Sequence, residues 1–212
     1  MNGLLKPSRG IDAINYWLGK LVMWLVLAAV LLSAGNAIVR KAFSIGSNSL
    51  LEIQWYLFAG VFMLGVGYVM LLNAHVRIDF VSAKLSKRTN AIIDAVGIVV
   101  FTIPLAIIMI DLGWPLFQRA FTSGEMSQNA GGLIRWPVLG LVPLGFAVLL
   151  AQAVSELIKR IAFLRGLTPE PFSVAHLKSD EEILAEELLA EAERHARAEA
   201  ELQRANAVGR AR

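Results

Sequence analysis

Hydrophobic positions in this chain gather into four long runs that are separated by short polar segments. Each run holds 16 to 22 consecutive residues without a charged side chain. A helix needs about 20 apolar residues to cross the hydrocarbon core of a bilayer. The runs are apolar on all faces, which leaves no polar side for water and disfavours buried helices of a soluble protein. The pattern predicts four transmembrane helices, at about residues 17–39, 51–74, 91–112 and 136–158.

The chain divides into two parts of different composition. Residues 1–166 carry the apolar runs and form the predicted transmembrane domain. Residues 167–212 are rich in Ala and Glu, with ten acids and six bases from Glu170 onward. Ser179 and Glu182 have the spacing of a capping box, which predicts a charged cytoplasmic helix in this tail. The fold class is therefore an all-α integral membrane protein with four transmembrane helices and a C-terminal helix.

A polar stretch joins the second and third runs. It contains His75, Arg77 and Asp79, followed by a basic cluster at residues 84–88. Asp79 can cap a short amphipathic helix at the membrane interface, with the cations turned toward anionic lipid headgroups. One histidine and one acid are too few for a dedicated metal site. We expect Arg77 and Asp79 to pair with each other or with a partner protein.

The distribution of Lys and Arg predicts the orientation. With the N-terminus inside, ten of these cations flank the inner ends of the runs and four flank the outer ends. Cytoplasmic segments are the ones enriched in Lys and Arg, so both termini are predicted to be cytoplasmic.

Composition excludes several kinds of site. Mean hydropathy is +0.59 and 56% of the residues are hydrophobic, which is rare for a soluble protein. Cysteine is absent, which excludes disulfides, zinc thiolates and iron–sulfur clusters. The basic residues flank apolar runs, so they indicate the membrane topology. We therefore predict no nucleic-acid partner. We predict no catalytic residue, no metal and no cofactor.

Two acids near the predicted membrane boundaries need partners. Ser49 and Glu52 form a capping box. The helix dipole would then stabilise Glu52 in the first turn of the second helix. The alternative is that Glu52 forms an ion pair with Arg40, Arg135 or a partner subunit. Asp111 lies at the unfavourable end of the third helix, and Arg119 or Arg135 is its expected partner. The predicted structural or subunit-interface polar residues are Glu52, His75, Arg77, Asp79, Asp111, Glu125 and Arg135.

Local sequence also predicts details of the helices. Residues 7–10, Pro-Ser-Arg-Gly, predict a break before the first span. Gly60, Gly65 and Gly67 predict a thin face for close helix contact. Pro104 predicts a kink in the third helix, which is expected to begin after Asn90. Residues 113–135 form the longest outer segment and the best candidate for contact with an external partner.

Three ordered segments resemble one family. Residues 51–58 with 65–68 are similar to the second helix of the small membrane subunit of tripartite ATP-independent periplasmic (TRAP) transporters, the DctQ-like family. Residues 75–79 with 85–88 resemble the central signature of that family. Residues 123–127, 136–137 and 143–145 resemble its last loop and helix.

The resemblance implies a sodium-coupled importer in the bacterial inner membrane. A periplasmic binding protein delivers a substrate, usually an organic acid, and a large elevator-type membrane subunit transports it. The small subunit is similar to a scaffold for the large one and carries no transport site. The resemblance does not identify the substrate. The alternative is a membrane anchor or electron-transfer subunit of an enzyme complex, but no histidine lies inside a span to bind a haem.

Overall fold

The chain is seen here in a computed structural model, which describes residues 5–44, 46–73, 85–168, 188 and 191. Every regular element in these ranges is helical, and one isolated bridge joins Met126 to Ile134. The elements are α1 (Leu5–Phe43), α2 (Asn48–Leu71), α4 (Lys87–Gly97), the π-helical turn η1 (Ile98–Thr102), α5 (Ile103–Ser123) and α6 (Trp136–Leu164).

Four helices are long and apolar enough to cross a membrane, because α4, η1 and α5 follow one another without a gap. This confirms the prediction of an all-α protein with four such helices. Most of the predicted amphipathic segment between the second and third spans lies outside the described residues, although Lys87 and Arg88 of its basic cluster begin α4. Almost all of the tail also lies outside them. The chain divides into two compact units, Met1–Ser173 and Val174–Arg212, and the structure described below belongs to the first.

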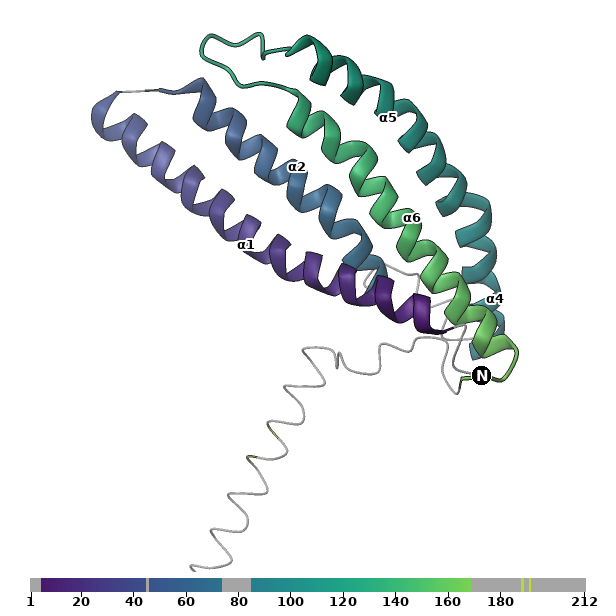
Figure 1. Cartoon of the computed structure of the whole chain (residues 1–212). Coiled ribbons are helices and arrows are strands. Elements are labelled where there is room, and N and C mark those ends of the chain that lie inside the picture. Colours follow the sequence, from purple (N-terminus) through teal and green to yellow (C-terminus); the bar gives the residue numbers. More distant parts are fainter. Residues whose placement is uncertain (1–4, 45, 74–84, 169–187, 189–190, 192–212) are drawn as a thin grey trace, which may run out of the picture. The chain divides into compact units, whose positions relative to one another are not determined.

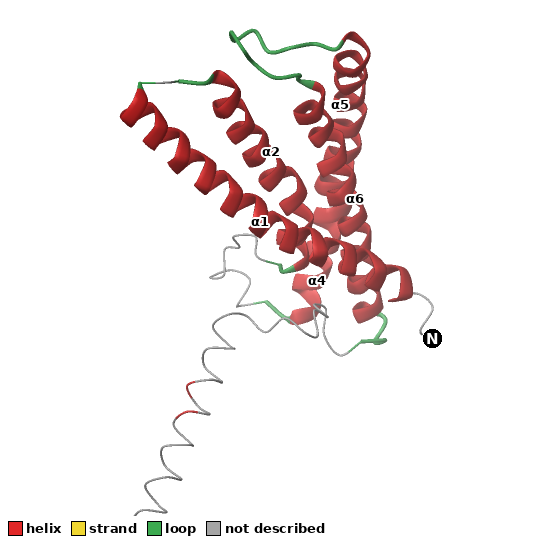
Figure 2. Cartoon of the chain, turned by 60° about the vertical axis from the view of Figure 1, so that its left-hand side comes forward, coloured by secondary structure: helices red, strands yellow, loops and turns green. Residues whose placement is uncertain are grey.

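Helix α6 is the element that contacts most of the others. It packs against α1, α2, α4, η1 and α5, and the long helices lie side by side in the order α1, α2, α6, α5 (Figure 1). The α1–α2 and α5–α6 connections lie at one end of this array, which we call the hairpin end. The start of α1, the end of α2, α4 and the end of α6 lie at the opposite end, which we call the N-terminal end (Figure 2).

Small residues allow the helices to approach closely. Gly60, Gly65 and Gly67 are all buried, which confirms the predicted contact face of α2. A Cβ atom at Gly67 would lie 2.1 Å from Oδ1 of Asn15 on α1. A Cβ atom at Gly145 of α6 would lie 2.6 Å from the carbonyl oxygen of residue 63 on α2. A larger side chain at Gly145 would therefore push the backbones of α6 and α2 apart, and one at Gly67 would displace the side chain of Asn15.

The first helix differs from its prediction. It runs unbroken from Leu5 to Phe43, so the expected break at residues 7–10 is wrong. Pro7 lies in the first turn, where a helix needs no N–H donor, and this position tolerates proline. Ser8 is only 2% exposed because α6 covers it, and tertiary packing therefore continues the helix through a segment with weak local propensity.

The third span begins earlier than predicted and contains an irregular turn. Ser86 caps α4 by accepting a hydrogen bond from the Thr89 backbone N–H at 3.1 Å, so the helix begins at Lys87 and not after Asn90. In η1 the Ile103 N–H bonds to the Ile98 carbonyl, one residue further back than in an α-helix. This π turn ends two residues before Pro104, which lacks an N–H donor.

The outer surfaces of the array are strongly apolar. Large hydrophobic side chains on α1, α2, η1 and α5 are exposed, among them Trp24, Phe62, Phe101 and Leu112. A soluble monomer rarely exposes so much contiguous apolar surface, whereas lipid or a membrane partner would cover it.

Candidate functional site

The connection between α5 and α6 is an ordered loop. Gly124 ends α5 in the left-handed conformation, at φ 62°. The loop then folds back on itself, because the Ser127 N–H bonds to the Leu133 carbonyl at 2.8 Å and the Arg135 N–H bonds to the Glu125 carbonyl at 2.9 Å. We call residues 124–135 the α5–α6 loop. Its backbone bonds give it a fixed shape at the hairpin end.

Glu52 of α2 holds this loop. Its Oε2 accepts a hydrogen bond from the Leu133 N–H at 2.6 Å, and its Oε1 accepts bonds from Asn129 Nδ2 at 2.8 Å and from the Ser127 hydroxyl. The residue is 6% exposed. Hydrogen bonds to an ionised acceptor are stronger than those between neutral groups, so this carboxylate can anchor the loop to α2.

The ion pair predicted for Glu52 is not seen in the described part of the chain. Arg135 instead forms a half-exposed ion pair with Glu125 inside the loop. Ser49 is not the cap, because α2 begins at Asn48 after Ser47, and the Ser49 hydroxyl donates to the Gly131 carbonyl.

Two further side chains of α2 contact the loop backbone. Asn48 Nδ2 donates to the Ala130 carbonyl at 2.9 Å, and the Tyr56 hydroxyl donates to the Ile134 carbonyl at 3.0 Å. Together with Glu52 and Ser49, these residues attach the α5–α6 loop along the first two turns of α2. We call this arrangement the hairpin-end cluster.

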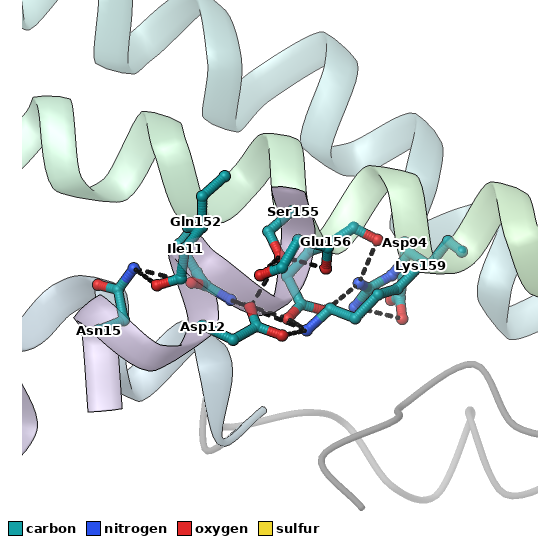
Figure 3. A network of polar contacts seen from close by, with 10 residues as sticks. Ile11, Asp12, Asn15, Asp94, Gln152, Ser155, Glu156 and Lys159 are labelled. Atoms are coloured by element: carbon teal, nitrogen blue, oxygen red, sulfur yellow. Dashed lines mark hydrogen bonds and ion pairs between the residues drawn. The ribbon is translucent and has the colours of Figure 1, made fainter. Parts of the chain in front are cut away.

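A second cluster joins α1 to α6 at the N-terminal end (Figure 3). Asp12 accepts hydrogen bonds from Ser155 Oγ at 2.7 Å and from Gln152 Nε2 at 3.0 Å, and it pairs with Lys159 Nζ at 3.2 Å. Asn15 Nδ2 donates to Gln152 Oε1 at 2.8 Å. Ser8 and Ser155 share a bond of 2.7 Å between their hydroxyls.

The same cluster extends to α4 through Glu156. This carboxylate binds Lys159 and, at 2.5 Å, Nη1 of Arg160. Nη2 of Arg160 lies 3.4 Å from Oδ2 of Asp94 on α4. Glu156, Lys159 and Arg160 are each 3% exposed, so water does not solvate their charges. The ion pairs within the cluster compensate these charges instead. We call these residues of α1, α4 and α6 the N-terminal-end cluster.

The sequence contains a signal for this cluster in the spacing of its polar residues. Ser8, Asp12 and Asn15 recur at helical spacing on one face of α1, and Gln152, Ser155 and Lys159 do so on α6. Two polar stripes of this kind at the same end of two apolar helices are expected to face each other.

Asp111 was predicted at the outer end of the third helix, but α5 continues to Ser123, so this acid lies well inside the helix. It is exposed on α5 and makes no hydrogen bond or ion pair within the described residues, so its expected pairing with Arg119 or Arg135 does not occur. An unpaired charged side chain at the centre of a bilayer costs about 2.5–3.5 kcal/mol on insertion scales. A partner from another chain would remove this cost.

The remaining candidate residues, His75, Arg77 and Asp79, lie outside the described residues. Within the described ranges, no three or more His, Cys, Asp or Glu residues gather where they could hold a metal ion. Within each of the two clusters the polar side chains form hydrogen bonds and ion pairs with one another. Such contacts are suited to joining helices.

The fold and its two clusters define a class of protein: a multi-pass membrane subunit in which buried polar side chains link neighbouring helices. A family model described as the DctQ component of tripartite ATP-independent periplasmic transporters matches residues 29–163. The chain belongs to this family and is the small membrane subunit of a TRAP transporter. No curated protein and no solved structure gives a significant match to it.

Proposed function

We propose that this chain is the scaffold subunit of a sodium-coupled importer. It stabilises the large elevator-type membrane subunit and carries no transport site of its own. Sodium coupling and an organic-acid substrate are proposed from the family to which the chain belongs. The periplasmic binding protein and the large subunit are the partners of a small subunit in such a transporter.

The observation that carries this proposal is the use of polar side chains at both ends of the array. The hairpin-end cluster attaches the α5–α6 loop to α2, and the N-terminal-end cluster links α1, α4 and α6. A subunit that braces a moving neighbour needs helices that do not separate. These hydrogen bonds and ion pairs hold the helices together at both ends of the array.

The proposed orientation places both termini in the cytoplasm and the α5–α6 loop on the periplasmic side. The excess of Lys and Arg near the opposite loops supports it. In this orientation the exposed residues Met126, Gln128 and Asn129 face the side on which a binding protein arrives. We therefore propose this loop as a contact surface for the binding protein.

Reconstitution tests the scaffold function. Liposomes would contain this subunit alone, the large subunit alone or both. The binding protein and a radiolabelled organic acid would be added outside, and a sodium gradient would be imposed across the membrane. We expect no uptake with this subunit alone and uptake with both. The large subunit alone is expected to show a lower initial rate and a lower thermal midpoint. Sodium-dependent uptake by this subunit alone would overturn the proposal.

A further inference from the structure

One face of α5 combines strong exposure with an acid, Asp111, that pairs with none of the described residues. Successive helical residues are 100° apart, so side chains three, four and seven positions from Asp111 share its face. This surface, the Asp111 face, consists of Pro104, Ile107, Ile108, Asp111, Trp114, Pro115 and Gln118, all exposed. The opposite side of α5 carries the buried small residues Ala106, Gly113 and Ala120. Asp111 therefore points away from the body of the subunit.

The packing of α5 on α6 places Asp111 deep below the hairpin end. A Cβ atom at Gly113 would lie 3.2 Å from Cδ of Pro143, so these two residues are level. Pro143 is seven residues into α6, and Asp111 is two residues beyond Gly113. At 1.5 Å per residue, Asp111 lies roughly 13 Å below the start of α6. An acid at this depth in a hydrocarbon-length helix is surrounded by hydrocarbon or by another protein.

A cation lies on the edge of the same face, two turns closer to the hairpin end. Arg119 is exposed and is paired with no other described residue. It borders a groove that is lined by Trp114, Phe117 and Phe121. The Asp111 face thus presents a deep negative charge, an apolar centre and a shallow positive charge.

We propose that the Asp111 face is the surface on which the large membrane subunit binds this chain. The proposal rests on the scaffold function proposed above. The matching helix of the large subunit presents a basic group, or another hydrogen-bond donor, level with Asp111. It presents an acidic or carbonyl group near Arg119. Apolar contacts with Ile107, Ile108 and Trp114 fill the space between these two points.

The depth of Asp111 selects a protein over lipid as the occupant. A lipid phosphate can bind Arg119 near the membrane interface, but a headgroup does not reach an acid that lies in the hydrocarbon region. Intramembrane acids are usually paired with other protein groups, because hydrocarbon offers no donor. The exposed face of α1 lacks such an acid, since the described part of that helix has its only acid, Asp12, in the N-terminal-end cluster.

Site-specific cross-linking in the assembled transporter tests this surface. The chain has no native cysteine, so single cysteines can be introduced and labelled with a benzophenone maleimide. Ile107→Cys lies on the Asp111 face. Leu105→Cys is a matched control, because Leu105 and Ile107 are both 52% exposed at nearly the same depth but lie about 160° apart around the helix.

We expect the label at residue 107 to cross-link to the large subunit, with a yield several-fold above that at residue 105. Equal yields at both positions, or no cross-link from residue 107 in a complex that co-purifies, would overturn the proposed face. If the wild-type chain does not co-purify with the large subunit at all, the scaffold function itself is contradicted. The two failures are therefore distinct.

Substitution of Asp111 gives a second, independent test. Asp111→Leu is expected to reduce co-purification with the large subunit several-fold, and Asp111→Asn less, because the amide retains an acceptor oxygen. The thermal midpoint of the full chain alone is expected not to fall, since no described residue pairs with Asp111. If Asp111→Leu leaves co-purification unchanged, the acid has no partner on the large subunit and the proposal fails.

Discussion

Glu52 is the residue through which α2 holds a loop that is distant in the sequence. Its position near the helix N-terminus follows from the sequence, but its carboxylate binds Ser127, Asn129 and Leu133 and no arginine among the described residues. The loop that supplies these donors is some 75 residues away in the sequence. No local pattern predicts which backbone N–H groups a folded loop will present.

The role of Glu52 predicts the effect of Glu52→Gln. The new amide group would place an NH₂ donor against N–H donors that now bind a carboxylate, and a hydrogen bond to a charged group contributes about 1.5–3 kcal/mol. We expect faster backbone hydrogen exchange in residues 125–135 and a lower thermal midpoint. Hydrogen exchange with mass spectrometry in detergent measures the first effect.

Glu125→Gln provides the matched control for this experiment. Glu125 belongs to the same loop but forms a half-exposed ion pair with Arg135. Ion pairs that are open to solvent contribute about 0–1 kcal/mol to the free energy of unfolding. Equal exchange rates in the two variants would mean that Glu52 does not anchor the loop.

At the scale of the elements, the sequence predicted the helices better than their contacts. The four apolar runs predict the long helices because the apolar composition needed to span a membrane is itself a local property. The glycines of α2 likewise predict its buried face. The continuity of α1 through Pro7 and Gly10 was missed, because it depends on contact with Ser155 of α6, far along the chain.

The N-terminal-end cluster predicts a large effect of Lys159→Met. This change leaves the Asp12 and Glu156 carboxylates without a cation that both contact. Removing one partner of a buried ion pair costs about 3–5 kcal/mol. We expect a marked fall in the thermal midpoint of the detergent-solubilised subunit.

Two variants make this measurement specific. Lys20→Met is the same substitution on an exposed lysine whose ammonium lies 4.8 Å from the Tyr16 ring centroid, and about 0.5–1 kcal/mol is expected there. Adding Asp12→Asn to Lys159→Met should restore part of the lost stability, because it removes one uncompensated charge. A similar midpoint for Lys159→Met and Lys20→Met would contradict the described cluster.

For the molecule as a whole, the family and the number of long apolar helices could be predicted from sequence, but the order of the helices in space could not. The position of α6 between α2 and α5 depends on matched surfaces such as Gly145 against residue 63 and Gly113 against Pro143. Each of these surfaces combines residues that are distant in the chain. The outward direction of Asp111 depends on the same packing.

The orientation of the whole subunit gives a further prediction. Gln128→Cys in the α5–α6 loop should react with a membrane-impermeant maleimide in cells whose outer membrane is permeable. Arg165→Cys, just after α6, should react only once the inner membrane is opened. Both residues are exposed, so accessibility within the protein is comparable. Labelling of residue 165 in cells with an intact inner membrane would reverse the proposed topology.

The placement of the cations and loop donors late in the chain has a consequence for biosynthesis. Asp12 and Glu52 enter the membrane early, but the groups that bind their carboxylates belong to residues 152–159 and 127–133 respectively. Glu52 can therefore bind its donors only after the α5–α6 loop is synthesised, and Asp12 can bind its partners only after most of α6 is synthesised. A product that ends before α6 therefore leaves Asp12 without the Gln152, Ser155 and Lys159 side chains that bind it in the complete subunit.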